Sequence, residues 1–236
     1  MLFVTGTGTD VGKTVVTAAL AALGLQRGSV AVVKPGQTGV GDDEPGDLAE
    51  VVRLAGPVAC HELVRYPDAL SPAAAARLSG RAPLDPARFY DLVLGLREDL
   101  VLIEGAGGLL VRYDEDGLTL ADLARALRAR VLVVVDPALG TLNHTALTLE
   151  ALAHRGVQLE GIVLGSWPAV PGLGERSNLR DLEMLAARPL LGALPAGAAG
   201  SPDFLALARD SVGPQLGGRW DPRAFRRRWD PSPLPP

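Results

Sequence analysis

The sequence contains few of the residues that cross-link a small protein or bind a metal through soft ligands. A single cysteine, Cys60, excludes a disulfide within the chain, and three scattered histidines argue against a zinc site. No apolar run approaches the roughly 18 residues of a membrane-spanning helix. The formal net charge of −4 gives no electrostatic reason to expect nucleic acid or an anionic membrane as a partner.

Lysine is scarce in a way that the other cation is not. Lys13 and Lys34 are the only lysines, against 21 arginines. A GC-rich genome would explain the arginines together with the 28 Gly and 19 Pro, but it leaves open why these two positions kept lysine. Both are therefore candidates for a role that needs a compact ammonium group.

The residues that are present describe an ordinary globular protein. At 236 residues and 47% hydrophobic, the chain can bury a sizeable core, and its length suits a single domain spanning 1–236. The beginning of the sequence has no basic region or cleavage site of a signal peptide, so we expect a cytoplasmic protein.

A Pro/Arg-rich tail begins at about residue 213. Phe225 and Trp229 are four residues apart, so a short helix could lay both rings on the body of the protein. Contact with nucleic acid is the alternative interpretation of this basic, aromatic segment.

Short apolar runs alternate with longer helical segments along the chain. Runs rich in Val, Ile and Leu without polar alternation predict strands buried on both faces of a parallel sheet. The expected strands are Leu2–Thr5, Val30–Val33, Leu100–Ile103, Val131–Val135, Gly161–Leu164 and Leu190–Leu194. Helix starts are indicated at Ser71-Pro72, at Asp85-Pro86 and by a capping box from Thr119 to Asp122, whose helix is expected to reach about Arg128. The fold class is α/β, a doubly wound, mainly parallel sheet with helices on both faces.

The first strand leads into a phosphate-binding sequence, GTGTDVGKT, at residues 6–14. Glycines allow successive amide groups to face a phosphate, Lys13 supplies a cation, and the Thr14 hydroxyl can bind Mg²⁺. The usual spacing puts glycine where this chain has Thr7, with Gly6 one residue earlier. A long Ala/Leu helix follows, as nucleotide phosphate binding requires.

Other polar segments follow the carboxyl ends of predicted strands, the edge where open α/β sheets bind ligands. Lys34 is expected to end the second strand, before a polar loop over 36–46, and Glu104 the third. Lys34 is either a functional cation or a solvated strand end. Glu104 stands where many phosphate-loop proteins hold a Mg²⁺-associated carboxylate, and the glycines after it permit close backbone approach. Segments 136–143 and 165–166 complete this edge.

Four segments in order resemble the dethiobiotin synthetases. They are the phosphate-binding segment, Val33–Pro35 with the nearby Thr38-Gly39, IEGAGG at Ile103–Gly108, and LGTLNH at Leu139–His144. The resemblance implies Mg²⁺- and ATP-dependent ring closure on 7,8-diaminopelargonic acid with CO₂, by a homodimer. It also implies that the helix start at 141–143 binds the substrate carboxylate across the dimer interface; a plain capped helix is the alternative.

The resemblance implies roles residue by residue. Catalytic roles fall on Lys34, Lys13 and Thr9. Nucleotide contacts fall on Asp10, Val11, Gly12, Lys13, Thr14, Val15, Gly165 and Ser166. Substrate contacts fall on Thr38, Gly107, Gly108, Gly140, Thr141, Leu142 and Asn143. Metal ligands are Thr14, Asp47 and Glu104, where Asp47 could instead cap a helix and Asp42, Asp43 and Glu44 compete with it.

Two departures from the family and one rival function remain to be considered. Gly165-Ser166-Trp167 replaces the family's base-reading Asn, so backbone readout that admits CTP or several triphosphates stands beside ATP. The family's SPH segment reads Ser71-Pro72-Ala73 here. The rival function, a ParA/MinD-like partitioning or scaffold ATPase, would carry an extra lysine where this chain has Gly8.

Overall fold

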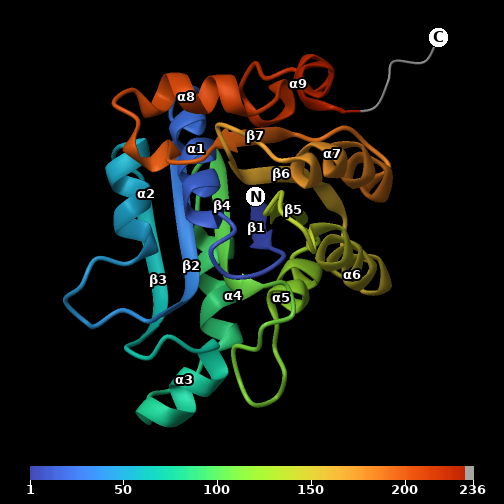
Figure 1. The fold of residues 1–236 in the computed structure, drawn as a ribbon. Helices are drawn as coiled ribbons and strands as arrows, with labels where there is room; N and C mark the ends of the chain where they lie inside the picture. Colours follow the sequence, from blue (N-terminus) through green and yellow to red (C-terminus); the bar gives the residue numbers. More distant parts are fainter. Residues whose placement is uncertain (232–236) are drawn as a thin grey trace.

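The computed structural model, which describes residues 1–231, is built around one parallel sheet (Figure 1). Within these residues the sheet has seven strands in the order β3-β2-β4-β1-β5-β6-β7. The strands are β1 (Leu2–Gly6), β2 (Val30–Thr38), β3 (Ala59–Tyr66), β4 (Leu100–Gly108), β5 (Arg130–Val135), β6 (Leu159–Trp167) and β7 (Gly192–Pro195). The expected α/β class and parallel sheet are confirmed.

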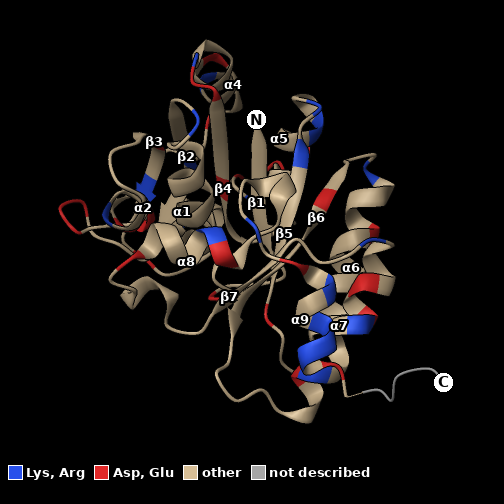
Figure 2. Ribbon diagram, turned by 90° about the horizontal axis from the view of Figure 1, so that it is seen from above, with Lys and Arg blue, Asp and Glu red and all other residues tan. Residues whose placement is uncertain are grey.

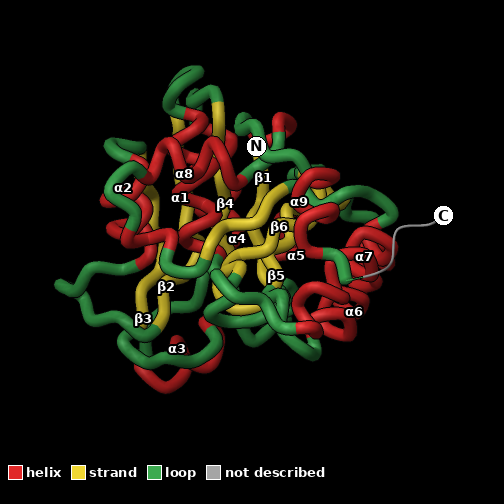
Figure 3. Tube along the Cα trace, turned by 45° about the horizontal axis from the view of Figure 1, so that its top comes forward, coloured by secondary structure: helices red, strands yellow, loops and turns green. Residues whose placement is uncertain are grey.

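Helices cover both faces of this sheet, as the tube view shows (Figure 3). On one face pack α1 (Lys13–Gly24), α2 (Asp47–Ala55) and α8 (Phe204–Ser211). On the other pack α4 (Pro86–Gly95), α5 (Leu120–Ala126), α6 (Thr141–His154), α7 (Leu173–Ala186) and α9 (Pro222–Trp229). The short α3 (Pro72–Ser79) lies beside the end of β3. No helix in residues 1–231 has the length and apolarity needed to cross a membrane.

The central strand β5 shows why an unbroken apolar run predicts a strand that is buried on both faces of the sheet. Residues 131–135 of β5 are all 0% exposed; Val131, Val133 and Val135 join the core on one face, and Leu132 and Val134 join the core on the other. Both faces of the strand are covered by helices, so no position has a reason to be polar.

The edge strand β3 at Ala59–Tyr66 is not among the strands expected from the sequence. Its sequence, ACHELVRY, mixes apolar and polar residues, and most of its side chains are half-buried. An edge strand pairs on one side only, so it lacks the continuous apolar run that marked the central strands.

Strands β2 and β4 are longer than expected, which corrects the placement of Lys34 and Glu104. The two strands pair as far as Val33 and Ile103; beyond that point β2 continues beside β3 to Thr38, and β4 continues beside β1 to Gly108. Lys34 and Glu104 therefore lie inside strands, at the point where the two strands part. The polar loop correspondingly begins after Thr38 rather than at Gly36.

The predicted helix starts are confirmed, although Ser71 occupies the N-cap position of α3 without a side-chain hydrogen bond. Asp85 caps α4 through the amide of Ala87, and Thr119 with Asp122 forms the capping box of α5. Helix α5 ends at Ala126 rather than near Arg128, whose φ of 49° is incompatible with a right-handed helix.

The C-terminal tail packs on the body of the protein, as its aromatic spacing predicted. Helix α9 places the rings of Phe225 and Trp229 at 5.1 and 6.0 Å from the ring of Trp167, at the end of β6. Its arginines gather beside α7 (Figure 2), where Arg226 forms an ion pair with Glu183. Residues 232–236, which include three of the tail's prolines, lie outside the described residues.

Candidate active site

The phosphate-binding segment forms a curled loop between β1 and α1. Gly12 has a φ of 94°, a left-handed conformation that glycine adopts without steric cost. The Nζ atom of Lys13 donates a hydrogen bond to the carbonyl oxygen of Gly8 at 2.8 Å, so the cation lies inside the loop. Burial lowers the pKa of Lys13, and repulsion from Lys34 lowers it further. An ammonium held this way is placed to meet an anion.

Lys34 lies between two carboxylates. It is 2% exposed, its Nζ is 2.8 Å from Oε1 of Glu104, and it also forms an ion pair with Asp47. Burial alone would lower the pKa of Lys34, but the two carboxylates outweigh that effect and raise it. A cation buried without such partners would be strongly disfavoured, so these contacts keep Lys34 charged.

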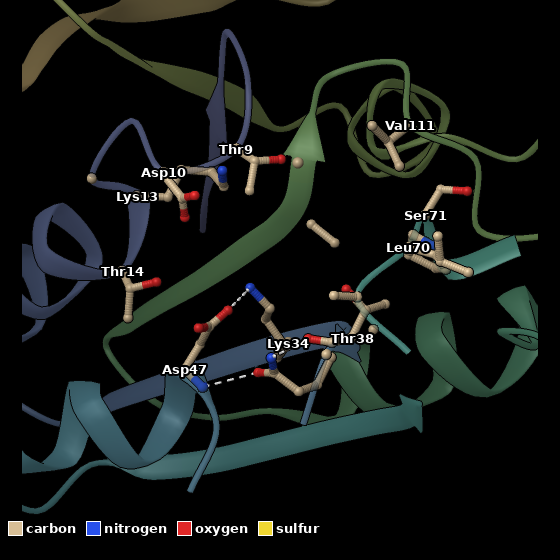
Figure 4. A pocket seen from close by; sticks show the side chains of 18 of the residues that line it. Thr9, Asp10, Lys13, Thr14, Lys34, Thr38, Asp47, Leu70, Ser71 and Val111 are labelled. Carbon is tan, nitrogen blue, oxygen red and sulfur yellow. Dashed lines mark hydrogen bonds and ion pairs between the residues drawn. The ribbon is translucent and has the colours of Figure 1, made fainter. Parts of the chain in front are cut away.

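Asp47 is directed to this cluster by Gln37, a residue that the sequence reading missed. Gln37 is 4% exposed, and its Oε1 accepts the backbone amide of Asp47 at 2.9 Å, where α2 begins (Figure 4). Asp47 is the first residue of α2 and not its cap, because Gly46 holds the N-cap position. Its contact with Gln37 depends on β2 passing next to this helix start. No local pattern in the sequence signals it.

Two of the three competing acids of the polar loop are engaged elsewhere. Asp42 accepts a hydrogen bond from the guanidinium of Arg81 at 2.6 Å, which lowers its pKa, and Glu44 accepts the amide of Gly41 at 2.9 Å. Asp47 lines the cavity described below, whereas Asp42, Asp43 and Glu44 do not. The geometry therefore favours Asp47 over its neighbours.

Thr14 contacts Glu104 beside the phosphate loop, and Asp47 is linked to Glu104 through their shared partner Lys34. The hydroxyl of Thr14 donates to Oε1 of Glu104 at 2.9 Å, while Oε2 of the fully buried Glu104 has no hydrogen-bond partner in the described part of the chain. Residues 1–231 contain no group of three or more His, Cys, Asp or Glu side chains that could hold a metal. Two carboxylates and a hydroxyl still fit Mg²⁺, which uses few protein ligands and keeps several waters.

A cavity of about 750 Å³ gathers most of the predicted site residues. Lys34 lies between the phosphate loop on one side and a wall formed by Thr38, Ser71 and Val111 on the other (Figure 4). The predicted residues that line it are Thr9, Asp10, Gly12, Lys13, Thr14, Val15, Lys34, Thr38, Asp47 and Gly107. Ser71, in the departing SPA segment, also lines the cavity. A volume of this size suits a small organic ligand.

Gly165 does not line this cavity but packs closely against the phosphate loop. A Cβ atom at Gly165 would lie 1.8 Å from the carbonyl oxygen of Val11, and one at Gly12 would lie 2.6 Å from the carbonyl oxygen of Gly165. The end of β6 thus packs directly against the phosphate loop. Only glycine allows this approach, so Gly165 supports the loop backbone. Ser166 beside it is exposed.

Residues 140–143, at the start of α6, also lie outside the cavity. Thr141 is 4% exposed and its hydroxyl has no partner within residues 1–231, whereas Asn143 is exposed. Gly108 lines a separate hollow of about 320 Å³ together with Leu110 and Leu147. The chain by itself therefore does not bring this segment to Lys34.

Comparisons with known proteins identify the family. The profile of a family described as "AAA domain" matches residues 1–201. The ATP-dependent dethiobiotin synthetase BioD of Frankia casuarinae is 60% identical over 234 residues, covering 97% of this chain and 98% of the relative. The protein of the same name from Parafrankia sp. is 59% identical with the same coverage, and that of Streptomyces coelicolor is 52% identical over 98% and 99% of the two chains. The chain belongs to the dethiobiotin synthetase family.

Solved structures of a ParA family ATPase and of a MinD cell division ATPase have a similar fold. A ParA family ATPase from Chlorobium tepidum matches with a TM-score of 0.54 at 16% identity, covering 92% of this chain and 95% of the other. The cell division ATPase MinD of Pyrococcus furiosus matches with a TM-score of 0.50 at 20% identity, covering 88% and 94%. At such identities the likeness shows a shared fold, while the sequence relatives place the chain among the dethiobiotin synthetases.

Proposed function

We propose that this family member is an ATP-dependent dethiobiotin synthetase, which closes a ureido ring on 7,8-diaminopelargonic acid with CO₂ for biotin synthesis. The observation that carries the proposal is the two-sided cavity. A phosphate loop forms one side, small polar and apolar groups form the other, and one buried ammonium, Lys34, lies between them. The reaction consumes a nucleoside triphosphate, and we place it in the cytoplasm.

The proposed reaction makes two C–N bonds in three steps. One amine of the diamine adds to CO₂ and loses a proton, which gives a carbamate. A carbamate oxygen takes the γ-phosphoryl group of the triphosphate and releases the diphosphate, forming a mixed anhydride. The second amine then attacks the carbamoyl carbon, loses a proton and expels phosphate as the ring closes.

The residues of the cavity suit these steps without a protein nucleophile. Two anions, the carbamate and the γ-phosphate, must be held together, and their mutual repulsion must be offset. Lys13 faces the phosphates from inside the loop, and Lys34 lies where both anions would meet. Thr9 is 3.7 Å from the position of a Cβ on Gly107, so the loop and the glycine run of β4 lie side by side at the reacting centre.

We propose that Thr14, Asp47 and Glu104 hold Mg²⁺. The unpartnered Oε2 of Glu104 supports this assignment, because a buried carboxylate oxygen normally has a partner. When bound, the ion neutralises charge on the triphosphate. Ion pairs with Lys34 hold both carboxylates close to the loop.

Turnover tests the proposal directly. Phosphate release should require both diaminopelargonate and bicarbonate, and dethiobiotin should form in equal amount. The relatives are named ATP-dependent, so ATP is the proposed nucleotide; running the assay with ATP, CTP, GTP and UTP compares kcat/KM among the bases. If the rate of nucleotide hydrolysis is the same with and without the diamine, the result would instead favour a switch ATPase.

We further propose a homodimer formed through the exposed apolar face of α6 and the loop after β4. Leu139, Leu147 and Leu110 are 87%, 57% and 44% exposed, which is costly for leucines that stay in water. In such a dimer, residues 140–143 would serve the partner's cavity.

Light scattering after size exclusion checks this arrangement. Leu147→Glu is expected to convert a dimer into monomers and to remove most of the activity, because it buries a charge in the interface. Leu94→Glu is the matched control, since Leu94 is 62% exposed on α4 and should change neither property. A monomeric wild-type enzyme with full activity would contradict the dimer.

A further inference from the structure

One peptide unit of β4, beyond the point where pairing with β2 ends, forms hydrogen bonds with two side chains. It joins Gly105 to Ala106. Its carbonyl oxygen accepts a hydrogen bond from Nζ of Lys34 at 3.2 Å, and its N–H donates to the hydroxyl oxygen of Tyr113 at 3.1 Å. A single planar group therefore connects the phenol of Tyr113 to the ammonium of Lys34.

The parting of two strands explains why this peptide depends on side chains. Pairing between β2 and β4 stops at Val33 and Ile103, so the 105–106 unit has no β2 backbone opposite it. Gly105 and Gly107 flank the unit, and glycine leaves rotation of the backbone comparatively free. Without a fixed partner for its N–H, the peptide could turn its carbonyl away from Lys34.

Tyr113 fills the space that the two strands leave between them. Its side chain is fully buried, and its ring lies 3.3 Å from the position that a Cβ atom on Gly36 of β2 would take. Burial raises the pKa of its hydroxyl, so the phenol stays neutral at ordinary pH. Tyr113 therefore contacts β2 through its ring and β4 through its oxygen.

We propose that Tyr113 is a positioning residue for Lys34: by accepting the N–H of Ala106 it fixes the 105–106 peptide so that its carbonyl orients the ammonium. Neither hydrogen bond involves substrate, so Tyr113 acts through the peptide and through Lys34. Its effect on catalysis rests on the proposed function. Its effect on the position of Lys34 does not.

The first test needs no turnover. The chain has only two lysines, so protein labelled with ¹⁵N-lysine gives two side-chain Nζ signals by NMR. Tyr113→Phe keeps the ring and removes the acceptor, and we expect the Lys34 signal to shift while the Lys13 signal stays. An unmoved Lys34 signal overturns the proposal.

A matched control separates positioning from the general loss of a buried hydroxyl. Tyr66 is also fully buried, and its hydroxyl donates to the carbonyl of Ala82 at 2.8 Å, outside the cavity lining. Tyr66→Phe is expected to move neither lysine signal, and equal shifts in both variants would count against Tyr113. If Tyr113→Phe fails to fold, 3-fluorotyrosine in a Tyr66→Phe, Tyr90→Phe background weakens the same acceptor, and a fixed Lys34 signal again overturns the proposal.

The second test uses kinetics. Tyr113→Phe should lower kcat about tenfold and leave KM for the nucleotide unchanged, because a displaced ammonium acts on the reacting groups. In a Lys34→Arg background the same change should cost little more, since residues that act through one another are not additive. Fully additive losses would overturn the proposal. A wild-type enzyme without diamine-dependent turnover would contradict the proposed function and leave the NMR result valid.

Discussion

Replacing Lys34 with arginine is expected to lower kcat by at least about 100-fold, equal to about 2.7 kcal/mol in activation free energy, with the fold intact. Lys34 is held by Glu104, Asp47 and the carbonyl of Gly105. A guanidinium presents its donors in a rigid plane and cannot occupy the point where these three acceptors converge. Steady-state kinetics with the diamine, together with thermal melting, measures both parts of the expectation.

The control for this substitution is the reverse change at a surface site. Arg53 is exposed, pairs with Glu50 and lies outside the cavity lining, so Arg53→Lys should leave kcat and melting nearly unchanged. Near-normal activity in Lys34→Arg would remove Lys34 from the mechanism. In that case the small number of lysines would reflect composition alone and would carry no functional meaning.

Gly165→Ala is expected to lower kcat/KM for the nucleotide by about 100-fold, since a misplacement of about 1 Å at a reacting site can cost that much. A Cβ atom 1.8 Å from the carbonyl oxygen of Val11 cannot be accommodated, so β6 or the phosphate loop must move. Nucleotide binding by calorimetry reports the displaced loop independently of turnover.

Gly95→Ala is the matched control. A Cβ atom at Gly95, the last residue of α4, would meet no atom within 4 Å in the described part of the chain apart from its chain neighbours and the backbone of its own helix. In a helix the change from glycine to alanine is worth about 0.5–1 kcal/mol in favour of folding, so activity should be kept and melting should not fall. If Gly165→Ala bound nucleotide normally, the loop would have to be more pliable than its packing indicates.

Local patterns were sufficient where a residue's environment depends on its own neighbours in the chain. The valines of β5, the capping box at Thr119 and the glycines of the phosphate loop are of this kind. The position of Lys34 at the ligand edge also followed, although its strand runs on to Thr38.

Contacts that depend on how different elements pack together could not be predicted from local patterns. Gln37 bonds to Asp47 because β2 passes the start of α2. Tyr113 bonds to Ala106 because the pairing of β2 and β4 ends before that residue. Gly165 stands in the segment that replaces the family's base-reading Asn, yet its closest contact is the backbone of the phosphate loop. In each case the partner is set by tertiary packing, which leaves no periodic signal.

The separation of β2 and β4 beyond Val33 and Ile103 also gives the cavity two walls that differ in local stability. The phosphate wall is carried by β1, which is paired on both sides, whereas beyond Val33 the opposite wall is carried by β2 and the edge strand β3. Local opening draws on the segments with the fewest neighbours. We therefore expect the wall holding Thr38 to open locally more readily than the phosphate loop, which would let a second substrate enter while the nucleotide stays bound.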